Sequence, residues 1–333
     1  MANIITMGEI LLRLTPENQG HLQQSGNFNV YYGGAEANVA VSLSNFGHNV
    51  SFLSAVPSHD IGDAALKQLQ KEGVGTKRVH RKGERLGIYF YEPGYSLKQA
   101  KVIYDRKFSS ILDLPEEIID WDAVFEQVDV LHTTGITPAL SDEMQEFTLT
   151  AIKEAKKRSV QVSFDFNYRS KLWSVEKARS AFFEILPYVD ICFAGFKDFA
   201  YLLDNEGPDV FSEEYLKKSY QEFASRYDIT YFSCTNRNVH SSSENEIKGY
   251  FFKNRTLYKS ESFSFSIVDR IGSGDAFAAG VLHGILSNMN AQEIVDFSTG
   301  TCVLKHFIYG DSSHLSVEEI KQLLMDKSKD VYR

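Results

Sequence analysis

Short apolar runs alternate with longer amphipathic stretches from about residue 128 onward. The runs at 128–133, 160–166, 190–193 and 229–234 have the length and the β-branched or aromatic content of buried strands. The stretches between them have the apolar spacing of helices, and 276–286 and 291–307 are the strongest helical segments. Strands that take turns with helices predict a parallel sheet wrapped by helices.

The first third of the chain mixes two textures. Apolar spacing predicts strands at 4–7 and 50–56 and helices at 37–46 and 61–72, which is an α/β pattern. Three further segments are rich in aromatic and β-branched residues and predict only strands, at 28–32, 87–91 and 101–105, with a turn-forming Glu-Pro-Gly at 92–94. We interpret these strands as a small sheet that projects from the α/β body.

The composition is that of a folded protein. The 333 residues are 43% hydrophobic and 24% charged, and 22 Gly with only 7 Pro exclude a collagen-like or disordered chain. The length fits two domains, or one large domain with an appendage. Because 35 Lys and Arg face 44 Asp and Glu, the net charge of −9 repels nucleic acid and anionic membranes. An anionic ligand therefore has to be bound by local chemistry.

The cysteines and the start of the chain bear on where the protein works. Cys192, Cys234 and Cys302 form an odd set at wide spacings, which match neither a disulfide framework nor a zinc site. Residues 1–8 lack the pattern of a secretory leader, and no apolar run approaches the roughly 18 residues that span a bilayer. We expect a cytoplasmic protein without nucleic-acid or membrane partners. An exposed loop at 240–246 and frayed last residues are also expected.

Two common phosphate-binding motifs are missing from the sequence. No Gly-Lys pair occurs, so the chain has no GxxxxGK[ST] loop. Gly272-x-Gly274 lacks the third glycine of a dinucleotide fingerprint, because Phe277 stands there. These absences disfavour a P-loop NTPase and a nicotinamide-dependent oxidoreductase.

Residues 269–280 form a small-residue turn that opens into a helical segment. Gly272 and Gly274 let several backbone N–H groups point at one spot, and the helix adds the positive end of its dipole, which together make an anion hole. Asp275 stands in the same turn, where its carboxylate can take a proton from a substrate hydroxyl during phosphoryl transfer. The alternative is an ordinary capped helix, which uses the same residue types.

A second glycine segment, 33–40, joins the small sheet to the first long helix. Gly33 and Gly34 let backbone approach a ligand, and Asn38 offers both a donor and an acceptor to a polyol. The alternative is a plain loop with small residues that pack against a helix.

Together, these two glycine segments resemble the paired signatures of the ribokinase-like (PfkB) family of sugar kinases. Segments 33–40, 102–106, 134–140, 164–173 and 305–311 resemble the 2-keto-3-deoxygluconate kinase branch. The resemblance implies a three-layer α/β/α sandwich over residues 1–333, with a mainly parallel sheet and a β-sheet lid formed by about 11–34 and 86–109. It also implies an ATP- and Mg²⁺-dependent kinase that converts 2-keto-3-deoxygluconate to its 6-phosphate.

The same resemblance assigns roles to individual residues. Asp275 would be the base, and Gly272, Ser273 and Gly274 would form the anion hole. The implied sugar contacts are Gly33, Gly34, Asn38, Tyr89, Tyr104, Arg106, Ile136, Arg169 and Asp311. The implied nucleotide contacts are Asn167, Arg169, Lys197, Thr235, Asn236, Arg237, Asn238, Gly272, Gly274 and Thr299. Asp198 would serve the metal.

Two arginines in the sugar set bear on the substrate class. A sugar acid needs a fork of donors for its carboxylate, which Arg106 and Arg169 can supply, whereas a neutral hexose needs carboxylates and amides. The alternative for Arg169 is a structural ion pair or a contact to the nucleotide phosphates. Tyr89 and Tyr91 share one face of a lid strand, which leaves one for the substrate and the other for a subunit contact. Because an isolated sheet has exposed edges, we expect a homodimer through the lid.

Two segments depart from the family pattern. Gly195-Phe196-Lys197-Asp198 stands where the family usually has Asn-x-x-Glu, so Asp198 would act on magnesium through water. The glycine-rich nucleotide turn is replaced by 235–239, where asparagines that tolerate left-handed backbone would preserve the turn. Arg237 would then lie near the phosphates or be a solvated loop charge.

Other readings remain at this point. A fructokinase-like hexose kinase is the alternative enzyme, and a non-catalytic sugar-binding sensor would explain the two altered segments. His132 and His306 show no metal-ligand spacing and are interpreted as core or helix-end residues. Cys234 is interpreted as packing at the end of a strand.

Overall fold

The computed structural model describes residues 1–203 and 207–325. Its main sheet has the strand order β13-β12-β11-β10-β9-β8-β1-β4-β5, and β14 also pairs with β12. The strands are β1 (Asn3–Met7), β4 (Asn49–Val56), β5 (Val79–Arg81), β8 (Val130–Thr134), β9 (Gln161–Asp165), β10 (Ile191–Phe193), β11 (Tyr231–Val239), β12 (Glu244–Lys253), β13 (Thr256–Lys259) and β14 (Phe263–Ser266). The pairs from β5 to β11 are parallel and those of β12 are antiparallel.

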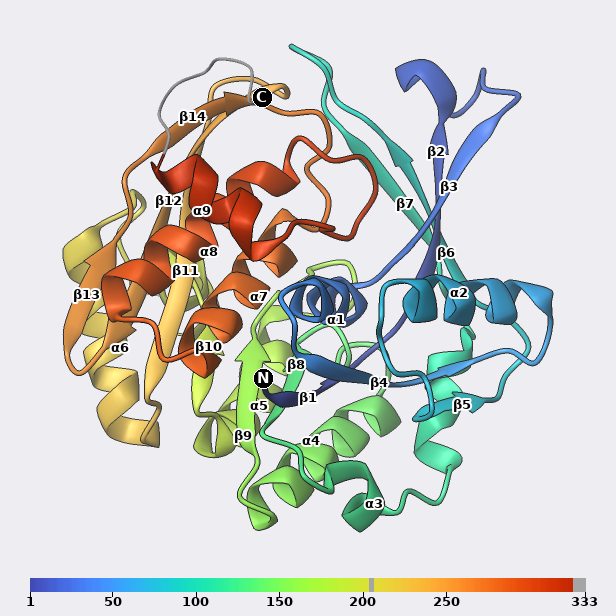
Figure 1. Ribbon diagram of the computed structural model, residues 1–333, viewed down its shortest axis with the longest axis horizontal. Coiled ribbons are helices and arrows are strands. Elements are labelled where there is room, and N and C mark those ends of the chain that lie inside the picture. Colours follow the sequence, from blue (N-terminus) through green and yellow to red (C-terminus); the bar gives the residue numbers. More distant parts are fainter. Residues whose placement is uncertain (204–206, 326–333) are drawn as a thin grey trace.

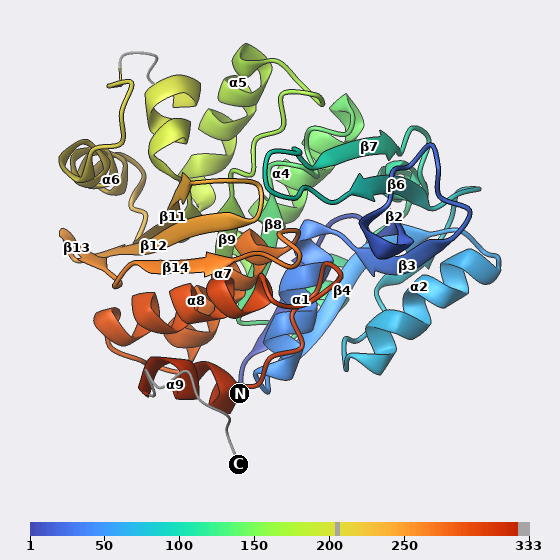
Figure 2. The ribbon, with the colours of Figure 1, turned by 90° about the horizontal axis from the view of Figure 1, so that it is seen from above.

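Helices cover both faces of this sheet. Figure 2 shows α4 (Asp142–Lys157), α5 (Val175–Ile185) and α6 (Glu213–Tyr227) on one face. The other face carries α1 (Ala35–Asn45), α7 (Ser273–Leu286), α8 (Ala291–Lys305) and α9 (Val317–Met325), while α2 (Asp60–Lys71) lies near β4 and α3 (Trp121–Phe125) near α4. One hydrophobic core fills the space on each face. The expected three-layer α/β/α fold is confirmed.

The central parallel strands are buried on both faces, which explains their continuous apolar runs. Val130 and Leu131 of β8 and Val162 and Phe164 of β9 are all fully buried. Because both faces of the sheet are covered, successive residues of a strand pack into opposite cores, as Val130 and Leu131 do.

A second, four-stranded sheet projects from the body (Figure 1). Its order is β3 (Phe28–Gly33), β2 (Leu11–Pro16), β6 (Gly87–Glu92) and β7 (Lys101–Asp105), and β2 and β6 pair in parallel. Alternation along the strands puts Arg13, Tyr89 and Tyr91 on the buried face. The opposite face carries Leu14, Val30, Phe90 and Ile103, with Val30 54% and Ile103 42% exposed. We call this sheet the small sheet.

The expected turn at 235–239 is wrong. Strand β11 runs through Thr235 and Asn236 to Val239 and pairs with β12, and no residue of this segment has a positive φ. Cys234 therefore lies within a strand and does not end one. The expected loop at 240–246 is also wrong in its last three residues, which begin β12. Burial alternates from Asn245 through Ile247, so pairing with β11 decides the conformation despite the polar composition.

The remaining expectations concern two histidines, the last residues of the chain and membrane-spanning helices. His132 and His306 are buried, as expected for core residues. The expected fraying of the last residues concerns 326–333, which lie outside the described residues. Within 1–203 and 207–325, no helix is both long and apolar enough to cross a membrane.

Candidate active site

A cleft of about 430 Å³ lies between the small sheet, the end of β9 and the start of α7. The whole Gly272–Asp275 turn lines this cleft. So do eight of the nine expected sugar residues, namely Gly34, Asn38, Tyr89, Tyr104, Arg106, Ile136, Arg169 and Asp311. The ninth, Gly33, packs behind Asp311, where an added Cβ would come within 2.3 Å of a carboxylate oxygen. The structure therefore brings the two glycine segments to one place.

The start of α7 has the backbone of an anion hole. Gly272 is the N-cap residue at φ +79°, and a Cβ there would lie 1.8 Å from the carbonyl oxygen of Asp311. A Cβ built on Gly274 meets nothing within 4 Å, so open space adjoins this turn. Since the first N–H groups of a helix have no acceptor within the helix, those of α7 remain available to a ligand.

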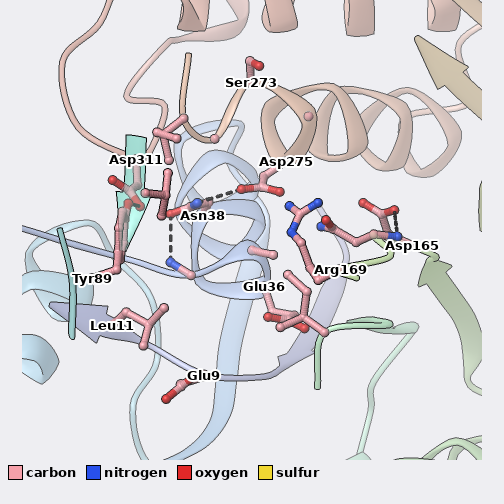
Figure 3. Close-up of a pocket in the computed structure, with 18 of the residues that line it drawn as sticks. Glu9, Leu11, Glu36, Asn38, Tyr89, Asp165, Arg169, Ser273, Asp275 and Asp311 are labelled. Atoms are coloured by element: carbon pink, nitrogen blue, oxygen red, sulfur yellow. Dashed lines mark hydrogen bonds between the residues drawn. The ribbon is translucent and has the colours of Figure 1, made fainter. Parts of the chain in front are cut away.

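Asp275 and Asn38 join the two segments directly (Figure 3). The Asn38 side-chain amide donates to Asp275 Oδ2 at 2.7 Å. Burial raises the pKa of Asp275 to about 6, against the lowering effects of this hydrogen bond and of the Arg169 charge. With this pKa the Asp275 carboxylate remains mostly ionised at neutral pH.

Arg169 lies beside carboxylates without bonding to them. Within the described ranges no hydrogen bond or ion pair engages its exposed guanidinium, so the structural ion pair considered from the sequence is not formed. Burial, followed by the charges of Asp275 and Asp198, raises the pKa of Asp165 to about 8. Figure 3 shows Arg169 between Asp275 and Asp165. The backbone N–H of Asn167 donates to the Asp165 carboxylate at 3.0 Å, which holds Asn167 beside Asp165.

Arg106 is partly neutralised by Glu9, a residue that the sequence had not indicated. Its Nη2 group donates to Glu9 Oε2, and Ser109 Oγ donates to the other Glu9 oxygen. The buried Nε of Arg106 has no hydrogen-bond partner among the described residues. Glu9 directly follows the carboxyl end of β1, where sites of parallel sheets form, and that position was the available signal.

Arg13 links the small sheet to the anion-hole turn, and no sequence pattern pointed to it. Only 1% of its side chain is exposed, and it pairs with Asp269 at 2.6 Å and Asp311 at 2.9 Å. Its guanidinium also lies 4.4 Å from the ring centre of Tyr91. Tyr91 is buried in this contact, so the expected subunit contact by Tyr91 is wrong. Tyr89 donates its hydroxyl to Asp311 and lines the cleft.

Glu36 is another cleft residue without an earlier assignment. It is buried at the start of α1, where one carboxylate oxygen accepts from Thr134 and from Thr137 at 2.8 Å. Burial raises the pKa of Glu36, and these hydrogen bonds oppose the shift. Glu36 thereby fixes the segment that carries Ile136 along the cleft.

The expected nucleotide and metal residues are only partly brought together. Asn167 and Arg237 line the cleft, whereas Lys197, Asp198, Thr235 and Asn236 do not, and Asn238 is exposed and bonds to Glu246. Thr299 is fully buried and its hydroxyl donates to the Val295 carbonyl, so it does not reach the cleft. Within the described residues no three His, Cys, Asp or Glu side chains form a metal cluster.

Comparison with known proteins identifies the family. The model of the pfkB family carbohydrate kinases matches residues 1–307. The chain belongs to this family. It is therefore a carbohydrate kinase with a ribokinase-like fold, and the oxidoreductase reading is excluded.

Individual proteins similar to this chain include sugar-acid kinases and solved structures of the same family. A 2-dehydro-3-deoxygalactonokinase of Haloferax volcanii is 29% identical over 97% of this chain and 96% of its own length. The solved structure of 2-dehydro-3-deoxygluconokinase from Thermotoga maritima has 35% identity and a TM-score of 0.92, covering 97% of this chain and 99% of that one. A PfkB family carbohydrate kinase from Listeria grayi has 37% identity and a TM-score of 0.92, covering 97% and 100%.

Proposed function

We propose that this kinase transfers the γ-phosphoryl group of ATP to the primary hydroxyl of 2-keto-3-deoxygluconate, giving the 6-phosphate. One observation carries the proposal: the anion-hole turn with its acid, Asp275, and the unpaired guanidinium of Arg169 share one cleft. The first feature suits phosphoryl transfer, and the second suits a substrate that carries a carboxylate.

Asp275 acts as the base. Asn38 orients its carboxylate by a hydrogen bond, and a pKa of about 6 leaves it ionised at neutral pH. As the bond from the sugar oxygen to phosphorus forms and the bond to ADP breaks, the hydroxyl proton passes to Asp275. The Gly272, Ser273 and Gly274 N–H groups stabilise the charge on the phosphoryl oxygens.

The arginines favour a sugar acid over a neutral hexose. No hydrogen bond or ion pair engages Arg169 within residues 1–203 and 207–325, and Arg106 lines the same cleft beside Glu9. A carboxylate satisfies both, whereas a neutral hexose leaves these donors without an anion. The sugar then lies along Gly33, Gly34, Asn38, Tyr89, Tyr104, Ile136 and Asp311.

Kinases of this family use ATP with Mg²⁺, and the residues present are compatible with both. Asp198 accepts from the Gly195 N–H at 2.7 Å, which leaves its second oxygen free, and burial raises its pKa to about 6. Hard carboxylate oxygens such as this one suit a hydrated Mg²⁺, whose charge would neutralise the phosphates. Asn167, Lys197, Thr235, Asn236 and Asn238 are the other proposed nucleotide contacts.

The small sheet is proposed to be both a lid over the sugar and a dimer interface. Its outward face is apolar at Leu14, Val30, Phe90 and Ile103, and none of these belongs to a hydrophobic core of the chain. A second copy of the chain, bringing the same apolar surface, would cover this face. The three buried free cysteines are compatible with a reducing cytoplasm.

A coupled ADP-release assay on a substrate panel tests the proposal. We expect the highest kcat/KM with 2-keto-3-deoxygluconate, followed by its galactonate epimer, and a much lower value with fructose. Arg169→Gln should lower kcat/KM for the keto acid by about 10–100-fold, with little effect on fructose, because a charge-assisted hydrogen bond is lost. A clear preference for fructose would replace the proposal with the hexose kinase. Sugar binding without any turnover would favour the alternative of a non-catalytic sugar-binding sensor.

A further inference from the structure

Arg237 is a partly buried cation whose hydrogen bonds within the described residues go to two neutral side chains. Its Nη2 group donates to Ser273 Oγ at 3.2 Å and to His306 Nε2 at 3.3 Å. In the described part of the chain no carboxylate forms an ion pair with it, and burial lowers its pKa, an effect to which the Arg270 charge adds. Its remaining donors are available to an anion that binds in the cleft, and such pairing is what a buried charge normally has.

Arg13 shows how the same fold satisfies a buried guanidinium that serves structure. It lies between Asp269 and Asp311, both within 3 Å, and it is not among the residues that line the cleft. Arg237 differs in both respects, since it lines the cleft together with Arg270 and the Gly272–Asp275 turn. The difference suggests that the partner of Arg237 arrives with the substrates.

His306 holds Arg237 in place as a neutral acceptor. The Nδ1 atom of His306 lies 2.7 Å from the Cys302 carbonyl, so this nitrogen carries the proton and Nε2 accepts from Arg237. Burial lowers the pKa of His306 to about 3, and the Arg237 charge adds to that effect. The imidazole therefore stays neutral and does not repel the guanidinium at working pH.

The guanidinium and the start of α7 converge on the same place. Ser273 is the first residue of α7 and belongs to the anion-hole turn, and the space beside Gly274 is open. An anion at this turn would receive the helix N–H groups and the free Arg237 donors together. A phosphoryl group is the anion whose charge and geometry match such a set.

We propose that Arg237 is a catalytic residue that binds the oxygens of the transferring γ-phosphoryl group, with His306 as its positioning residue. This inference rests on the proposed kinase function. The reaction still balances as above: the sugar oxygen gains the phosphoryl group, ADP leaves, and the hydroxyl proton goes to Asp275. Arg237 transfers no proton and stabilises charge on the phosphoryl oxygens.

The test compares the wild type with Arg237→Gln, and with Arg226→Gln as a matched charge change on the exposed surface of α6. Sugar phosphorylation, the affinities of a non-hydrolysable ATP analogue and of ADP, and the thermal midpoint are measured. We expect kcat to fall by about 10²–10³-fold in Arg237→Gln. The ATP analogue should bind about tenfold more weakly, ADP should bind as before, and the midpoint should be unchanged or higher because an unpaired charge is removed.

Each other outcome has a defined meaning. A kcat within threefold of the wild type, or a lower midpoint with equal analogue affinity, overturns the assignment and gives Arg237 a structural role. If the wild type phosphorylates no sugar of the panel, the proposed function fails, and Arg237 is then judged by the analogue affinity alone. His306→Phe should lower kcat in the same direction, and the double variant should lose no more than Arg237→Gln, because both act through one contact.

Discussion

The acid limb of the pH profile tests the assignment of Asp275 as the base, and Asn38→Ala is the informative perturbation. The Asn38 amide donates to the Asp275 carboxylate at 2.7 Å and stabilises its charged form. Burial raises the pKa of Asp275 and this hydrogen bond lowers it, so removing the donor should raise the pKa further. Asn38 also lines the sugar site, so the position of the limb, and not the rate alone, is the diagnostic quantity.

The size of the effect follows from the pKa. With a value of about 6, about 91% of Asp275 is ionised at pH 7 and about 9% at pH 5, so kcat/KM of the wild type falls about tenfold between them. The sign is fixed because a base works only when deprotonated. A hydrogen bond to a charged group contributes roughly 1.5 kcal/mol or more, which corresponds to about one pH unit. The limb of Asn38→Ala should therefore lie near pH 7.

The assay is coupled ADP release from pH 4.5 to 8.5 at low sugar concentration, where kcat/KM reports the free enzyme. Asn45→Ala is the control: Asn45 lies on the same helix, outside the cleft, and its side-chain amide donates to the Val41 carbonyl at 2.9 Å. Its profile should match the wild type. A wild-type limb near pH 4, or identical limbs in Asn38→Ala and the wild type, would refute the coupling between these two side chains.

Three further changes test other parts of the structure. Asp275→Asn should lower turnover more than 10³-fold while leaving the affinity of an ATP analogue nearly intact, measured by calorimetry; substantial remaining turnover would remove the base assignment. Arg13→Met should lower the free energy of unfolding by roughly 3–5 kcal/mol in urea titrations because two buried carboxylates lose their partner. The exposed Arg81→Met serves as its control and should cost less than about 1 kcal/mol. Phe90→Asp should give a monomer in light scattering while sugar turnover persists; an unchanged dimer, or a monomeric wild type, would contradict the proposed interface.

The local backbone at the start of α7 was predictable from the sequence. A Gly-x-Gly-Asp favours a turn into a helix, so the helix start at Ser273, on which the proposed anion hole and base depend, could be placed before any contact was known. Asn38 and Asp275 are 237 residues apart, and only the resemblance to a family placed them in one site. The strand and helix rhythm likewise predicted the layers, because parallel strands buried on both faces leave continuous apolar runs.

The rest depended on distant partners. Arg13 stands in an ordinary strand pattern, and its burial follows from Asp269 and Asp311, 256 and 298 residues away. Likewise, nothing local in the asparagine-rich 235–239 segment favours a strand, and its pairing with β12 decides the matter. The conformation of 235–239 also decides what Arg237 can contact. In a turn the position of its side chain would be undetermined, whereas on strand β11 the side chain reaches Ser273.

The pairing of charges within the cleft bears on how an acidic chain would bind the two anionic substrates of the proposed reaction. The chain carries a net charge of −9, and the cleft is lined by both charge types: the cations are Arg106, Arg169, Arg237 and Arg270, and the acids are Glu9, Glu36, Asp165, Asp275 and Asp311. Over distances beyond about 8 Å, physiological salt screens the surface charges, so groups in direct contact dominate the binding energy. Glu9 offsets Arg106 in part, whereas Arg169 and Arg237 have no paired carboxylate in the described structure. Arg169 and Arg237 are thus the two cleft cations that the proposed reaction leaves to its carboxylate and its phosphoryl group.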